Sequence, residues 1–103
     1  MGMDEVFRAL GDPTRRAVVR LLRERGPLTA GEITERFSLA KSTMSGHFAV
    51  LRQAGLLVAE RQGSRLVYSL SLSVFEETVD VVMELLGAGG RAQQATRRSE
   101  RSQ

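Results

Sequence analysis

The residues best suited to bind a partner lie in one short segment, SLAKSTMSGHFAVLRQAG, at positions 38–55. Met44, Phe48 and Leu51 recur at helical spacing, so one side of this segment can bury against a core. The other side is short and hydrogen-bonding where most surface helices carry Glu and Lys; it consists of Lys41, Ser42, Thr43, Ser45, Gly46 and His47. Hydroxyl and imidazole groups both donate and accept hydrogen bonds, so this side is suited to a polar surface at close range.

Catalysis is one alternative, because a serine and a histidine can form a nucleophile and its base. Ser45 and His47 lie close together on one helix, however, and the sequence offers no plausible third member of a triad. The run GAGG at residues 87–90 follows a helix, where it can end that helix, and does not open one as a phosphate-binding loop must. We therefore expect no enzyme, no catalytic residues and no cofactor.

The distribution of charge is more informative than the formal net charge of +3. Residues 1–88 contain as many Lys and Arg as Asp and Glu, so the whole excess lies in the Arg-rich segment 89–103. Between Lys41 and Arg65, by contrast, four basic residues accompany a single acid, Glu60. This arrangement favours an anionic partner for the middle of the chain.

Composition limits the class of protein further. A chain of 103 residues buries only a modest core, and oligomerisation is a common remedy at this size. The sequence contains no cysteine, which excludes disulfides and thiolate metal sites and fits a reducing cytoplasm. No apolar run reaches the length of a membrane span. We expect a cytoplasmic protein that does not enter a membrane.

The pattern of helix signals and apolar spacing predicts the order ααααββα, mainly helical with one small β-hairpin. Asp12 and Pro13 mark a helix start, and Thr29 with Glu32 has the spacing of a capping box. The predicted helices cover residues 3–10, 13–25, 29–37, 41–53 and 72–86, and the predicted strands run from about 57 to 61 and from 66 to 70, with Gly63 in the turn. Helices 29–37 and 41–53, joined by a tight turn, form a helix-turn-helix candidate.

The last predicted helix has more apolar surface than a small monomer needs to cover. Its acids fall within one narrow arc, and apolar residues fill most of the rest. We expect this surplus to form a homodimer interface together with the apolar stripe of the first helix. The predicted interface residues are Met3, Val6, Phe7, Leu10, Phe75, Val79, Val82 and Leu86.

Four segments together give the chain a family resemblance that covers about residues 3–86 in unbroken order. LGDPTRRAVVRLL, LTAGEITERF, STMSGHFAVLRQAGLL and RQGSRLVYSL resemble the ArsR/SmtB-type bacterial repressors, and the ALGDPTRR opening and short wing look most like the SdpR-like autorepressor branch. The resemblance implies a winged helix-turn-helix fold in a homodimeric, sequence-specific DNA-binding repressor that acts on an inverted-repeat operator.

Within that resemblance, the polar side of helix 41–53 is expected to enter the major groove of double-stranded DNA. Ser, Thr and His are short enough to reach base edges, while Lys41 at the rim can reach phosphate. In the hairpin, Arg61 and Arg65 are expected to contact the DNA backbone or minor groove, and Arg61 is the stronger candidate because Arg65 is shifted by one position. For Arg15 and Arg16, phosphate contact and a simple solvated face remain about equally open.

Metal sensing, common among these relatives, is not expected here. Their thiolate site on the helix before the recognition helix needs cysteine, but that segment reads TAGEITERF. The alternative site on the last helix needs paired His and carboxylates, and the chain has a single His. The inducing signal therefore stays open between a small molecule, a sequestering protein and the concentration of the repressor itself.

Two further expectations concern organisation. Residues 1–88 are expected to form one DNA-binding and dimerisation domain, followed by a disordered, Arg-rich tail at 89–103. The main rival function is a winged helix that serves only as a protein–protein interaction module without specific DNA binding. Acids on the recognition face would favour that rival, and the sequence has none there.

Overall fold

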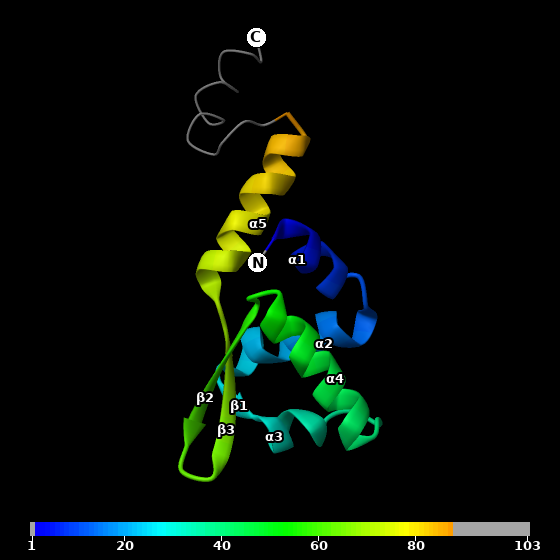
Figure 1. The fold of residues 1–103 in the computed structure, drawn as a ribbon, viewed down its shortest axis with the longest axis vertical. Coiled ribbons are helices and arrows are strands. Elements are labelled where there is room, and N and C mark those ends of the chain that lie inside the picture. Colours follow the sequence, from blue (N-terminus) through cyan, green and yellow to red (C-terminus); the bar gives the residue numbers. More distant parts are fainter. Residues whose placement is uncertain (1, 88–103) are drawn as a thin grey trace. The chain divides into compact units, whose positions relative to one another are not determined.

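The computed structural model describes residues 2–87, so the tail predicted for 89–103 lies outside the described residues. The elements, in chain order, are α1 (Met3–Ala9), α2 (Pro13–Arg25), β1 (Leu28–Thr29), α3 (Ala30–Thr34), α4 (Lys41–Gln53), β2 (Leu57–Gln62), β3 (Arg65–Leu70) and α5 (Leu72–Leu85) (Figure 1). The chain divides after Leu72 into two units, which are described separately. The five predicted helices and the hairpin are all present.

The sheet contains one strand more than the sequence predicted. β1 pairs antiparallel with β3, with Leu28 opposite Tyr68 and Thr29 opposite Val67, and the strand order is β1-β3-β2. Two residues are too few to show a period-2 pattern, and Thr29 also caps the next helix, so the signal for β1 is hidden. Helices α2 and α3 pack against β3, and α4 packs against β2.

The predicted helix starts are made by the expected side chains. The Asp12 carboxylate accepts a hydrogen bond from the backbone N–H of Arg15 at 3.0 Å, at the start of α2. At the start of α3, Thr29 Oγ1 accepts from the N–H of Glu32 at 3.1 Å, and the Glu32 carboxylate accepts from the N–H of Thr29 at 2.8 Å. The capping box is thus confirmed, although α3 ends at Thr34 and only turns continue to Phe37.

One side of helix α4 is buried in the core of the first unit. Met44, Phe48 and Leu51 are buried as predicted, and the Phe48 ring lies 4.8 Å from the ring of Tyr68 on β3. The helix ends in a Schellman motif, in which Gly55 takes a φ of +83° and the N–H of Leu56 donates to the carbonyl of Leu51. These contacts fix which side of α4 remains exposed.

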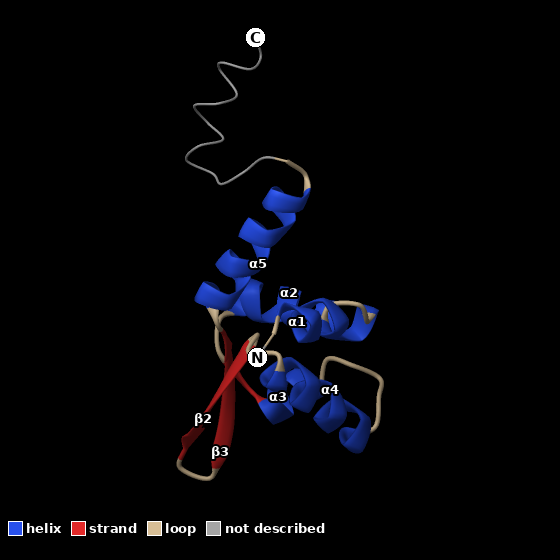
Figure 2. Cartoon of the chain, turned by 45° about the horizontal axis from the view of Figure 1, so that its top comes forward, coloured by secondary structure: helices blue, strands red, loops and turns tan. Residues whose placement is uncertain are grey.

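Strands β2 and β3 form the predicted hairpin around a two-residue turn. Gln62 is opposite Arg65, and Gly63 in the turn has a φ of +66°, a conformation that favours glycine. In Figures 1 and 2 the turn end of the hairpin projects beyond the helices, while the rest of it packs against them. It therefore forms a wing beside the helix-turn-helix of α3 and α4.

Helix α5, taken by itself, has the surplus apolar surface that the sequence predicted. Val79 and Val82 are exposed, as are Leu85 and Leu86 at its end, while its four acids are also exposed to solvent. Phe75 is half-buried. Among residues 2–87, no helix is long and apolar enough to cross a membrane.

Candidate nucleic-acid interface

The exposed side of α4 is a surface of short side chains without a carboxylate. Lys41, Ser42, Thr43, Ser45 and Gly46 are all exposed, as predicted. A methyl group built on Gly46 would have no atom within 4 Å, so this surface is open as well as short. Ala49 is also exposed and was missed by the sequence analysis, although it lies three and four residues after Gly46 and Ser45, on the same helical side.

His47 is placed differently from the other predicted contact residues. Only 17% of its side-chain surface is exposed, and it lies at the edge of the exposed side of α4. Its Nδ1 lies 3.2 Å from Nη1 of Arg15 and 3.9 Å from the carboxylate of Asp12. The histidine therefore joins α4 to the beginning of α2, which sequence spacing alone could not indicate.

Arg15 makes contacts within its own chain that neither of its two open interpretations includes. Its guanidinium donates to the carbonyl of Ala9 through Nε at 2.8 Å and to the carbonyl of Arg8 through Nη2 at 3.2 Å, besides reaching His47. Arg16 donates to the carbonyl of Leu10 at 2.9 Å. Both arginines thus donate to carbonyl groups at the end of α1, where the Arg8 carbonyl also accepts from the backbone N–H of Gly11 at 3.1 Å. They were missed as structural residues because their partners lie six or seven positions away.

Two carboxylates near the helix starts are stabilised in their charged form. The backbone N–H of Arg15, followed by the positive charge of the Arg15 side chain, holds the pKa of Asp12 below its ordinary value, although desolvation opposes the shift. The N–H of Thr29 does the same for the pKa of Glu32, with smaller contributions from the Thr29 hydroxyl, Arg65 and Arg36. Both carboxylates thus stabilise the start of a helix by accepting a hydrogen bond from a backbone N–H.

The two arginines of the wing lie on opposite faces of the hairpin. Arg61 is opposite Leu66, on the face that also carries Tyr68, whereas Arg65 is opposite Gln62 on the other face. Both are exposed. The two side chains therefore cannot both face the same partner across one face of the hairpin.

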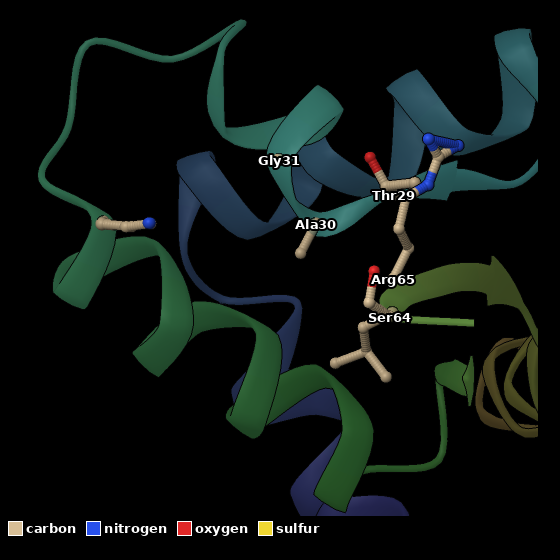
Figure 3. A pocket seen from close by; sticks show the side chains of 7 residues that line it. Thr29, Ala30, Gly31, Ser64 and Arg65 are labelled. Carbon is tan, nitrogen blue, oxygen red and sulfur yellow. The ribbon is translucent and has the colours of Figure 1, made fainter. Parts of the chain in front are cut away.

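An open pocket of about 350 Å³ lies where the wing meets the helix-turn-helix. Figure 3 shows the Arg65 side chain extending towards Thr29, with Ala30 and Gly31 beside them. The residues that line the pocket are Thr29, Ala30, Gly31, Lys41, Ser64, Arg65 and Leu66. The pocket thus brings Lys41 of α4 and Arg65 of β3 to one basic concavity.

The residues predicted for a dimer interface differ in exposure. Phe7, Val79, Val82 and Leu86 are exposed; Met3, Leu10 and Phe75 are half-buried; Val6 is buried. Val6 therefore contributes to the core of its own chain rather than to an open surface.

The described residues offer few side chains that could bind a metal ion together. In the part of the chain that the structure describes, no group of three or more His, Cys, Asp or Glu side chains could hold a metal ion.

The combination of a helix-turn-helix, an exposed polar second helix and a basic β-hairpin defines the winged helix-turn-helix class. A helix-turn-helix domain model matches residues 10–60. The transcriptional repressor SdpR of Bacillus subtilis is 36% identical over 87 residues, which cover 84% of this chain and 96% of SdpR. The arsenic resistance regulator ArsR1 of Pseudomonas putida is 34% identical over 79 residues, 77% of this chain and 61% of that protein.

Solved structures agree with this class. The crystal structure of an ArsR family transcriptional regulator has a TM-score of 0.76 and 29% identity, and the match covers 82% of this chain and 92% of that one. The NMR structure of a homodimeric winged helix-turn-helix DNA-binding domain, Mb0332 of Mycobacterium bovis, has the same fold, with a TM-score of 0.66 at 22% identity over 86% of this chain and 82% of that one. The chain belongs to the ArsR family of winged helix-turn-helix transcriptional regulators, and these relatives are regulators rather than enzymes.

Proposed function

We propose that this regulator is a cytoplasmic, homodimeric repressor that binds an inverted-repeat operator in double-stranded DNA. In this proposal, residues 1–88 act as one DNA-binding and dimerisation domain. One observation supports the proposal most strongly. The exposed side of α4 carries short, polar side chains and no carboxylate, and it lies beside a wing with two exposed arginines. The absence of cysteine is consistent with the reducing cytoplasm, the compartment that holds bacterial chromosomal DNA.

The fit to the major groove follows from the size of the side chains. Helix α4 is 13 residues long and presents Ser42, Ser45 and Gly46 at the centre of its exposed side, so its backbone can approach base edges closely. Its N-cap, Ala40, has no side-chain acceptor, which leaves the first backbone N–H groups available to a phosphate. Lys41 at the same end adds a positive charge, and Arg61 on the wing can reach the neighbouring backbone.

A dimer would cover the exposed apolar stripe of α5, and its two-fold symmetry would match that of an inverted-repeat operator. Phe75, Val79, Val82 and Leu86 lie on one stripe of that helix, and three of the four are exposed. The SdpR relative is named as a repressor, and the Mb0332 domain is homodimeric, which supports the same assembly for this chain. Two recognition helices related by a two-fold axis read half-sites about one helical turn apart.

Footprinting of the purified protein on the DNA upstream of its own coding sequence tests the proposal. We expect a protected region with two-fold symmetry. Ser45→Glu should abolish protection because it places a carboxylate against the DNA, whereas Gln53→Glu, the same negative charge at the exposed far end of α4, should retain most of it.

The rival function, a winged helix that binds only other proteins, predicts a different result. In that case the wild-type protein would give no defined footprint on any fragment, and the two charged variants would bind DNA equally poorly. Such a result would overturn the DNA-binding proposal.

A further inference from the structure

We infer that Arg15, which need not touch DNA, determines what His47 recognises: it fixes the imidazole so that Nε2 presents an N–H donor to a hydrogen-bond acceptor on a base edge. This inference rests on the proposed DNA-binding function and assigns a specificity-determining pair to it. Arg15 is a positioning residue in this scheme, and His47 is the contact residue.

The donor-only character of arginine decides the position of the imidazole proton. Nη1 of Arg15 lies 3.2 Å from Nδ1 of His47, and a guanidinium has five N–H donors and no acceptor. Nδ1 must therefore offer its lone pair, and in the neutral ring the proton resides on Nε2. The competing arrangement, in which Nδ1–H donates to Asp12, is disfavoured because that separation is 3.9 Å, beyond hydrogen-bond length.

Arg15 is itself held in place, so the arrangement is built rather than incidental. Its Nε and Nη2 donate to the carbonyls of Ala9 and Arg8, and these two bonds leave Nη1 directed at the ring. The backbone N–H of Arg15 also donates to Asp12, whose carboxylate is the other charged group facing the imidazole. The side chain thus connects the end of α1, the start of α2 and the recognition helix.

A fixed donor has a defined consequence in the major groove. It can bond to N7 or O6 of guanine, N7 of adenine or O4 of thymine, and it cannot bond to the amino groups of adenine or cytosine. His47 lies at the edge of the exposed side of α4, beside exposed Gly46, and retains a partly exposed side chain. A freely exchanging imidazole would accept either kind of partner and discriminate less.

The first test needs no DNA. Nitrogen-15 NMR of the imidazole at pH 8, above the ordinary titration range of histidine, reports which nitrogen carries the proton. The wild-type ring should be in the Nε2–H form. Arg15→Met should shift the population towards Nδ1–H, while Arg16→Met, which removes a similar bond to the end of α1, should not. A wild-type ring in the Nδ1–H form overturns the inference even if Arg15→Met fails to fold.

The second test uses the footprinted operator and single base-pair or 7-deazapurine substitutions within it. At one position per half-site, loss of the acceptor should weaken wild-type binding roughly 3- to 10-fold, as expected for one hydrogen bond. This discrimination should disappear in His47→Ala and in Arg15→Met, remain in Arg16→Met, and fall no further in the double variant Arg15→Met/His47→Ala.

The outcomes separate this inference from the proposed function. A clear footprint with discrimination that is unchanged in Arg15→Met overturns the role of Arg15 and leaves the repressor proposal standing. A wild-type protein that gives no footprint overturns the repressor proposal and the base contact with it, while the NMR result still decides whether Arg15 fixes the ring.

Discussion

At the scale of single residues, this regulator combines side chains that are exposed with side chains that are already engaged. Ser42, Ser45 and Gly46 are exposed, do not contribute to the core, and are available to contact a partner directly. His47 and Arg15, by contrast, are connected to each other and to the end of α1. The difference predicts that substitutions in the first group change DNA recognition alone, whereas those in the second also affect how the helices are joined.

Base contacts and backbone contacts should respond differently to substitution. Ser45→Ala should cost about 1 kcal/mol on the preferred operator and much less on mismatched DNA, because one base hydrogen bond is lost. Arg61→Ala should weaken binding to all sequences and lower the slope of log affinity against log salt by about 1. Fluorescence anisotropy on a panel of operators at several salt concentrations measures both, and identical profiles for the two variants would contradict the assignment.

The two helix-start carboxylates should make stability depend on acid pH. The pKa values of Asp12 and Glu32 are lowered in the folded chain, so their stabilising contribution is complete well above pH 4 and is lost as the pH falls through the folded-state values. Asp12→Asn and Glu32→Gln keep a hydrogen-bonding cap but cannot titrate there. Urea unfolding between pH 6 and pH 2 should therefore show a shallower acid loss in the double variant than in the wild type.

At the scale of elements, the position of α4 determines which of its side chains are available. The helix packs against β2, and its apolar stripe of Met44, Phe48 and Leu51 is buried. Tyr68 on the central strand lies against Phe48 and links the recognition helix to the wing. The geometry of the proposed DNA interface therefore depends on core packing beneath it.

A matched pair of leucines tests this dependence. Leu51→Ala should lower the free energy of unfolding by about 2–5 kcal/mol, because the side chain is fully buried and its removal leaves a cavity. Leu39→Ala removes the same atoms from a side chain that is 41% exposed, in the turn before α4, and should cost less than about 1 kcal/mol. Chemical denaturation followed by circular dichroism measures the difference, and equal losses would argue against the described core.

At the scale of the whole molecule, the first unit supplies the proposed DNA-binding surface, and α5 carries a second surface of another kind. Val79, Val82 and Leu86 give α5 an exposed apolar stripe, while its acids make it unsuited to contact DNA. A second copy of the chain is the partner that fits both the stripe and a two-fold operator.

Disruption of the α5 stripe should therefore separate the subunits. Val79→Glu should convert the dimer to monomer at micromolar concentration. It should also reduce operator affinity by more than tenfold, since each half-site would then be bound by a single subunit independently of the other. Val58→Glu is the matched control for the oligomeric state, because Val58 is 50% exposed, Val79 is 46% exposed, and Val58 lies on the wing strand rather than on α5. Sedimentation velocity decides the point; a folded wild-type monomer would remove the argument for a dimer.

Metal ions should not release the protein from its operator. Release requires that the metal bind the free and DNA-bound states with different free energies, and the described residues offer no cluster of donors for it. Gel-shift titrations with zinc, copper and arsenite, each with and without chelator, should leave the complex intact. Stoichiometric release by any of them would direct attention to the carboxylates of Asp80 and Glu84 on α5.

Much of this protein was determined by local sequence. Caps and apolar spacing located all five helices, because a helix is formed by residues three and four positions apart. The hairpin was equally visible, since Gly63 permits the tight turn between two short runs that contain apolar and β-branched residues. The short polar side of α4 could also be recognised, because the residues that must be buried on the opposite side are spaced along the same helix.

Other features were decided only by the tertiary structure, because their partners are distant in sequence. Strand β1 exists because Leu28 and Thr29 meet Tyr68 and Val67, some 40 positions away. The pair of Arg15 and His47 is separated by 32 positions, and Arg15 became a structural residue only when α1 and α4 were brought to the start of α2. Periodicity reports which side of an element is apolar, whereas the neighbour that each side meets depends on how the elements pack.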